Sequence, residues 1–127
     1  MAYDGFDLSG KVAVITGGNG GIGLGFARAI AAAGADVSIW GTNAEKNAIA
    51  EEELKVINPT ASAILCDVSD DQAVDQAMAG VVDRYGRIDA CFPNAGIGTQ
   101  NQKAFFEPLS YTHLRAHATS LHLVCRL

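Results

Sequence analysis

Long apolar runs are missing from this sequence, and their absence excludes one class of protein. No stretch approaches the roughly 20 consecutive apolar residues that a membrane-spanning helix needs, although 49% of the 127 residues are hydrophobic. The first ten residues also lack the basic segment and the following apolar stretch of a secretory signal peptide. We therefore expect one globular domain in the cytoplasm, with no membrane partner.

Basic residues are scarce as well. Nine Lys and Arg stand against 14 Asp and Glu, which gives a formal net charge of −5 at pH 7. A protein that binds nucleic acid needs a basic patch to face the phosphates, and no such patch occurs along this sequence. The acidic balance therefore argues against nucleic acid as a partner.

Cysteine is also rare. Cys66, Cys91 and Cys125 are odd in number and far apart, which fits neither a disulfide framework nor the ligand spacing of a zinc site. Cys66 and Cys91 lie in apolar runs, so we expect them to be small core residues and not reactive thiols.

What the sequence does contain is a regular alternation of strand and helix signals. Short apolar, β-branched runs predict buried strands over residues 11–16, 36–40, 61–66 and 88–92. A helix is predicted over 21–33, and two more follow the capping-box pairs Thr42 with Glu45 and Ser69 with Gln72. The apolar positions of these helices are Ile22, Phe26, Ala29 and Ile30, then Ala50, Leu54 and Ile57, then Val74, Met78, Val81, Val82 and Tyr85.

This alternation predicts the fold class. Strands that alternate with helices form parallel sheets through right-handed crossovers, with helices on both faces. We therefore predict an α/β, doubly wound Rossmann sheet with the strand order 3-2-1-4, ending after the fourth strand.

A glycine-rich segment, Thr16-Gly-Gly-Asn-Gly-Gly-Ile-Gly23, lies between the first predicted strand and the first predicted helix. Glycine permits positive φ and lets backbone N–H groups approach a diphosphate without an intervening Cβ, and the helix then points its positive end at the phosphates. Two registers fit: Gly18, Gly20 and Gly23 spell GxGxxG, and Gly17, Gly21 and Gly23 spell TGxxxGxG.

The second register belongs to a set of three motifs. TGGNGGIG at 16–23, Cys66-Asp67-Val68 after the third strand and Pro93-Asn94-Ala95-Gly96 after the fourth resemble, in order and spacing, the short-chain dehydrogenase/reductase family over residues 8–109. The resemblance implies an NAD(P)-dependent oxidoreductase that transfers hydride between the dinucleotide and a ketone or secondary alcohol, and that forms a homo-oligomer at full length. It implies that the cofactor is held by Gly17, Asn19, Gly21, Ile22 and Gly23 at the diphosphate and ribose, by Asp67 and Val68 at the adenine, and by Asn94, Ala95 and Gly96.

The choice between NAD and NADP depends on the end of the second strand. A carboxylate there binds the ribose 2′-hydroxyl of NAD, whereas a nearby arginine accepts the phosphate of NADP. This chain has Trp40-Gly41-Thr42-Asn43, with neither charge, although Lys46 could reach a phosphate. A phosphate without an arginine would be poorly compensated, so we favour NAD.

A turn or helix cap is the structural alternative for Asp67, in place of a contact with the adenine.

No catalytic residue is assigned. The family resemblance implies a Tyr-x-x-x-Lys segment with an assisting serine, but none of the four lysines follows a tyrosine by four positions. Tyr111 and Arg115 imitate the spacing with the wrong cation.

The last 18 residues differ from the rest. They hold all three histidines and no Asp, Glu or Gly, and residues 110–127 resemble a translated sequencing-library adapter. We predict a cofactor-binding half-domain over 1–109, a non-native tail over 110–127, and no turnover by this chain. The alternatives are a non-catalytic NAD(P)-binding module with a native tail and, more weakly, a metal site at His113, His117 and His122.

Overall fold

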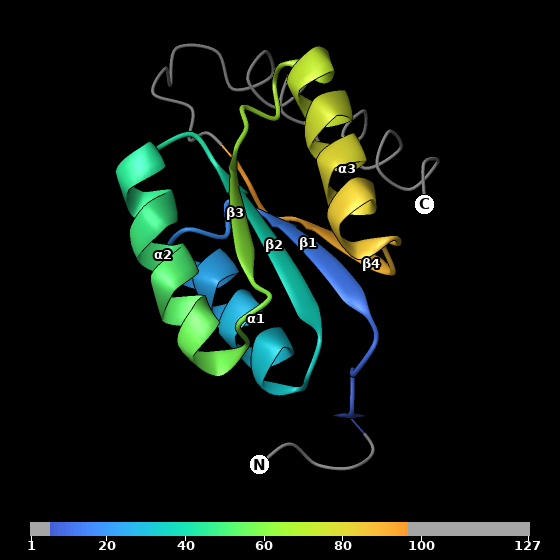
Figure 1. The fold of residues 1–127 in the computed structure, drawn as a ribbon. Coiled ribbons are helices and arrows are strands. Elements are labelled where there is room, and N and C mark those ends of the chain that lie inside the picture. The colour runs from blue at the N-terminus through green and yellow to red at the C-terminus, as the bar shows by residue number, and fades with distance from the viewer. Residues whose placement is uncertain (1–5, 97–127) are drawn as a thin grey trace, which may run out of the picture. The chain divides into compact units, whose positions relative to one another are not determined.

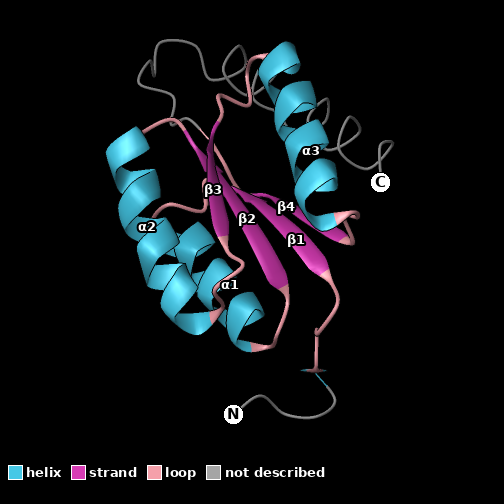
Figure 2. Ribbon diagram, in the orientation of Figure 1, coloured by secondary structure: helices cyan, strands magenta, loops and turns pink. Residues whose placement is uncertain are grey.

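The computed structural model describes residues 6–96, and those up to Ala95 belong to one compact unit. Its elements, in chain order, are β1 (Val12–Thr16), α1 (Gly21–Ala32), β2 (Asp36–Gly41), α2 (Ala44–Ile57), β3 (Ser62–Leu65), α3 (Asp71–Tyr85) and β4 (Ala90–Pro93). Figure 2 shows the strict alternation of strands and helices that the sequence predicts. Within the described part no helix is both long and apolar enough to cross a membrane.

The four strands are parallel and lie in the order β3-β2-β1-β4, so the predicted fold class and strand order are confirmed. Thr16 aligns with Trp40 of β2 on one side and with Pro93 of β4 on the other. The carboxyl ends of all four strands therefore lie at the same end of the sheet, which is where ligands bind in open α/β folds.

Helices cover both faces of the sheet. In Figure 1, α1 and α2 lie together on one side of the strands and α3 lies on the other. The core on the first side joins strand residues to the buried faces of α1 and α2; it comprises Ile15, Ala27, Ala31, Val37, Ile39, Ala50, Leu54 and Ala61. All five residues of β1 are buried, as expected for an inner strand packed on both faces.

Two predicted helix starts are wrong by one residue. The side chain of Asn43, and not that of Thr42, caps α2 by accepting a hydrogen bond from Lys46 N at 3.0 Å. Asp70, and not Ser69, caps α3 by accepting from Gln72 N at 3.0 Å. Asn and Asp rank with or above Ser and Thr as caps. The Ser69 hydroxyl donates instead to Asp67 Oδ1 at 2.7 Å.

The apolar faces are also narrower than predicted. Ile22 and Phe26 of α1 are 73% and 45% exposed, and Ile57 and Val82 are exposed too. The fully buried residues of α1 are the small ones, Gly23, Ala27 and Ala31, while Leu24 and Ile30 are only partly buried against the core. A helix that approaches its strands this closely has no room for large side chains on the contact face, so Phe26 lies beside it and stacks on Phe92 of β4 with ring centroids 5.8 Å apart.

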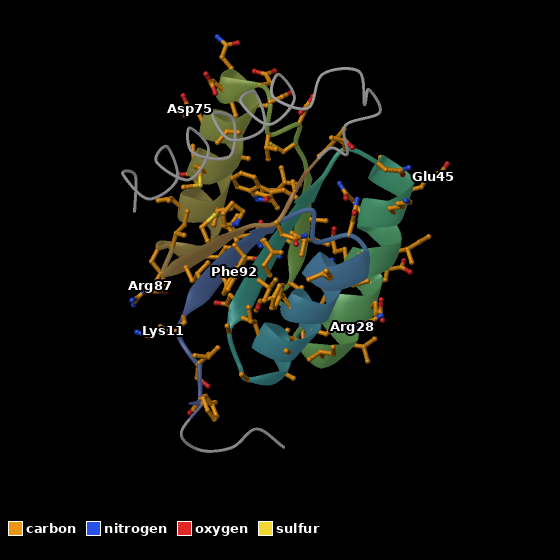
Figure 3. All side chains as sticks on the ribbon, turned by 180° about the vertical axis from the view of Figure 1, so that it is seen from behind. Lys11, Arg28, Glu45, Asp75, Arg87 and Phe92 are labelled. Carbon is orange, nitrogen blue, oxygen red and sulfur yellow. The ribbon has the colours of Figure 1, made fainter. Side chains whose placement is uncertain are left out.

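At the amino ends of the strands, Asp89 connects β1 to the segment before β4. Its Oδ2 accepts from Val12 N at 2.8 Å, and its own N–H donates to Val12 O at 2.8 Å. The hydrogen bond from Arg87, followed by that from Val12 N–H, lowers the pKa of the Asp89 carboxyl. Figure 3 shows Arg87 and Lys11 at this end of the molecule, away from the edge formed by the strands' carboxyl ends.

Candidate dinucleotide site

The glycine-rich loop begins where β1 ends. Gly17 N donates to Trp40 O at 2.7 Å, which fixes the start of the loop against β2. Gly17 and Gly21 have φ of 66° and 55°, a region that favours glycine. Gly20 is the N-cap of α1 and provides no side chain, and the first turn of α1 contains no acid. The N–H groups at this helix end therefore meet no capping side chain, an arrangement suited to an anion.

The motif after β4 packs against this loop. Ala95 N donates to Thr16 Oγ1 at 3.0 Å, and Asn94 Nδ2 approaches Gly17 O at 3.4 Å. A Cβ on Gly17 would lie 3.1 Å from both Asn94 Nδ2 and Ala95 Cα. The structure thus brings together two motifs that are far apart in sequence, since Gly17 and Asn94 are separated by 77 residues. Gly96, the last residue of the second motif, is also the last residue that the structure describes.

Among the glycines of the loop, Gly23 leaves the least room for a side chain. It is buried in the first turn of α1, where a Cβ would overlap Gly17 O and lie 2.6 Å from Asn94 Nδ2. Gly18 is similarly confined, because its Cβ would lie 2.6 Å from Ile39 Cγ2. Ile22, in contrast, is largely exposed at the helix start. Glycines of both sequence registers therefore contribute, Gly17 and Gly21 through a positive φ and Gly18 and Gly23 because a Cβ would overlap neighbouring atoms. Gly20 meets neither condition, since its backbone is extended and a Cβ there would have no atom within 4 Å.

Asp67 and Val68 follow β3 at the same edge of the sheet. The Asp67 carboxylate accepts from Ser69 N at 2.9 Å and from Ser69 Oγ at 2.7 Å. Asp67 thus has the turn role considered as the structural alternative, and its exposed position leaves that role compatible with ligand contact. Cys66, just before it, is buried, and burial raises the pKa of its thiol.

Cys91 of β4 is half-buried, and burial raises the pKa of its thiol to about 11. Both described cysteines therefore remain protonated at neutral pH. Cys66 is a core residue, as predicted, whereas Cys91 is only half-buried and lies outside the buried core. Cys125, the three histidines, Tyr111, Arg115 and the predicted boundary at residue 109 lie outside the described residues.

Two neighbours of the loop were not expected from the sequence. Asn47 of α2 is buried and accepts a hydrogen bond from Asn19 Nδ2 at 2.9 Å. Gly41, at the end of β2, lies under this pair. Asn47 could have been recognised by its spacing, because it precedes the buried Ala50 and Leu54 by three and seven residues on one face of α2.

Comparison with known proteins identifies the family. A family model described as short chain dehydrogenase matches residues 11–117. The chain belongs to the short-chain dehydrogenase family. The resemblance carried by its three sequence motifs is thereby confirmed.

The curated relatives of this short-chain dehydrogenase are sugar and polyol enzymes among others. The sorbose reductase of Candida albicans is 40% identical over 92 residues, which make up 72% of this chain and 33% of the relative. The sorbitol dehydrogenase of Cereibacter sphaeroides is 41% identical over 90 residues, 71% of this chain and 34% of the relative. The chain spans about a third of the length of these relatives, and their names mark the family as one of oxidoreductase enzymes.

Solved structures agree with the fold. An NAD⁺-bound xylitol dehydrogenase matches with a TM-score of 0.80 and 28% identity, over 92% of this chain and 46% of that one. A metagenomic short-chain oxidoreductase in complex with NADP matches with a TM-score of 0.76 and 31% identity, over 91% of this chain and 55% of that one. Both dinucleotides thus occur among the family's solved structures.

Proposed function

We propose that this chain is the dinucleotide-binding part of an NAD(P)-dependent oxidoreductase. The observation that carries the proposal is the arrangement of the glycine-rich loop, residues 17–23, against the first turn of α1, which we call the cradle. Gly20 leaves the helix end without a capping side chain, and a Cβ on Gly23 would overlap Gly17 O. In this proposal the diphosphate and adjoining ribose are held by Gly17, Asn19, Gly21, Ile22 and Gly23. The adenine is held by Asp67 and Val68, and Asn94, Ala95 and Gly96 line the cofactor near its ribose.

The charge around the cradle supports this assignment. The helix end supplies partial positive charge without an acidic side chain in its first turn. The loop that carries the remaining backbone N–H groups is held in place before the ligand arrives. Gly17 N–H donates to Trp40 O, and Ala95 N–H donates to Thr16 Oγ1. Preorganised donors of this kind bind phosphate without the cost of ordering a loop.

We further propose that NAD is preferred over NADP. The segment after β2 offers Thr42 and Asn43, and the Asn43 side chain already serves as the cap of α2. Neither residue carries the positive charge that a 2′-phosphate calls for. A ribose with a free 2′-hydroxyl needs only a neutral hydrogen-bond partner, so it is the better match to this neutral strand end.

Calorimetric titration of the 127-residue chain tests the proposal. We expect NAD and ADP-ribose to bind with similar affinity, because the contacts assigned to the described residues lie in their shared diphosphate and adenosine. NADP should bind about tenfold more weakly, a difference of ~1.4 kcal/mol. Folded protein that binds none of the three would contradict the function, whereas tighter binding of NADP would contradict only the stated preference.

We propose that catalysis in the whole protein depends on residues beyond this chain. When bound, the nicotinamide supplies or accepts the hydride, and a proton donor must serve the developing alkoxide. Tyr85, the one tyrosine among residues 6–96, donates its single hydroxyl proton to Thr60 O at 2.5 Å and accepts from Ser62 Oγ at 2.8 Å. Thr60 precedes β3 and Ser62 begins it, at the end of the sheet opposite the glycine loop, so Tyr85 cannot reach the site.

The gene itself provides the test of this catalytic proposal. Genomic sequence read through codon 110 should depart from residues 110–127 and continue into a segment with Tyr-x-x-x-Lys. A genomic stop after codon 127, with residues 110–127 encoded in the genome, would contradict the proposal and favour a non-catalytic dinucleotide-binding module. The cytoplasmic location and the homo-oligomer of the whole protein likewise remain predictions.

A further inference from the structure

Asn47 is a buried polar residue on the apolar face of α2. It is 5% exposed, and its side-chain amide forms hydrogen bonds to three separate segments. Nδ2 donates to Gly41 O at 3.0 Å, at the end of β2, and to Ile64 O at 3.3 Å, in β3. Oδ1 accepts from Asn19 Nδ2, in the middle of the glycine-rich loop, at 2.9 Å. A buried amide with all of these partners is an unusually constrained group.

The partners fix which way each amide points. Backbone carbonyls can only accept, so the nitrogen of Asn47 must face Gly41 and Ile64. Its oxygen is then the atom that faces the loop, and Asn19 must present its own nitrogen to it. The orientation of the Asn19 side chain is therefore imposed by Asn47, although Asn19 itself is only half-buried.

Gly41 makes the room for this pair. A Cβ at this position would overlap Asn19 Nδ2 and lie 2.5 Å from Asn47 Oδ1. The φ of Gly41 is not among the positive values of the chain, so the backbone conformation does not require glycine there. What requires glycine is the space that the two asparagines occupy over the strand end.

We propose that Asn47 is a positioning residue for dinucleotide binding, which acts by holding Asn19 and the middle of the glycine-rich loop against the end of β2. This inference rests on the proposed function. It assigns a role to a residue that touches the loop from α2 and that lies outside the three sequence motifs. The loop's first residue is already tied to β2 through Gly17 N and Trp40 O, and Asn47 supplies the second tie, two residues further along.

A double-mutant cycle on the 127-residue chain tests the proposal. Asn19→Ala and Asn47→Ala should each weaken NAD binding about tenfold, the loss of roughly one hydrogen bond with its preorganisation. The double variant should also be about tenfold weaker and not hundredfold, because Asn47 acts through Asn19. Gly41→Ala, which keeps both asparagines but separates them, should reproduce the same loss.

Asn58 provides the matched control. It lies at the opposite end of α2, where Nδ2 donates to Ala35 O at 2.8 Å and Oδ1 accepts from Thr60 N at 3.1 Å. Asn58→Ala deletes the same groups and should lower the denaturation midpoint while leaving the Kd for NAD within about twofold of wild type. This comparison separates loss of stability from loss of positioning.

The outcomes distinguish the two levels of the hypothesis. Wild-type protein that binds neither NAD nor ADP-ribose would overturn the proposed function and this inference with it. Wild-type binding that Asn47→Ala and Gly41→Ala leave within about twofold would overturn the inference alone. Fully additive losses in the double variant would show that Asn47 does not act through Asn19, and would overturn it as well.

Discussion

Gly23→Ala is expected to weaken NAD binding by at least about a hundredfold, or ~2.7 kcal/mol. The new methyl group would overlap Gly17 O and come within 2.6 Å of Asn94 Nδ2. Either the start of α1 moves away from β1 or the segment after β4 moves away from the loop, and both changes displace the cradle. Overpacking of this kind also costs about 1–3 kcal/mol of stability. Titration calorimetry and urea denaturation of the same sample measure the two effects.

Gly25→Ala is the control for this change. Gly25 lies in the same helix two residues later, is exposed, and has no atom within 4 Å of the position that a Cβ would take. Alanine there should raise stability by roughly 0.5–1 kcal/mol through helix propensity and leave the Kd unchanged. If Gly23→Ala bound NAD as tightly as Gly25→Ala does, the cradle could not be the diphosphate site.

Much of the fold could be predicted because its signals are local. Apolar β-branched runs and glycine stops define the strands, and the alternation with helices allows few topologies besides the observed order. The positions of Gly17, Gly21 and Gly23 could be predicted for the same reason, since a turn that must pass close to a helix start restricts side chains within a short stretch. Gly34 and Gly86, both with positive φ, likewise follow the ends of α1 and α3, where glycine is the residue that most readily takes this conformation.

What could not be predicted depends on how elements pack. The apolar residues of α1 suggest that Ile22 and Phe26 face the core, but a helix held close by Gly23 turns its small residues inward instead. The stacking of Phe26 on Phe92 requires knowing that β4 lies beside β1. The caps at Asn43 and Asp70 differ from the predicted ones by a single residue, because neighbouring polar side chains compete for the same N–H groups.

Asn47 illustrates the limit best. In sequence it is a polar residue at a helix position that should be apolar, which is a signal of a buried contact but does not name the partner. Its partners come from the first loop, the second strand and the third strand, and only the folded sheet brings them together. Sequence motifs therefore locate the surface that we propose faces the ligand, and packing reveals what holds that surface in place.

Leu54→Ala is expected to lower the free energy of unfolding by about 2–5 kcal/mol. The Leu54 side chain is fully buried in the cluster between α1, α2 and the sheet, so its removal leaves a cavity that this cluster cannot readily fill. A typical domain has only about 5–15 kcal/mol to lose. Urea denaturation followed by circular dichroism measures the effect, and a loss under about 1 kcal/mol would contradict the packing of α2.

Val56→Ala and added ligand complete this test. Val56 lies in the same helix but is 88% exposed, so its replacement should change stability by less than about 0.5 kcal/mol. NAD at about 100 times its Kd should restore roughly 2.7 kcal/mol to Leu54→Ala, because a ligand that binds only the folded state stabilises it by that amount. Gly23→Ala should gain almost nothing at the same NAD concentration, since its defect is in the site and not in the core. A Leu54→Ala protein that NAD fails to stabilise, beside a wild type that binds it, would show that α2 shapes the site as well as the core, the coupling that Asn47 provides.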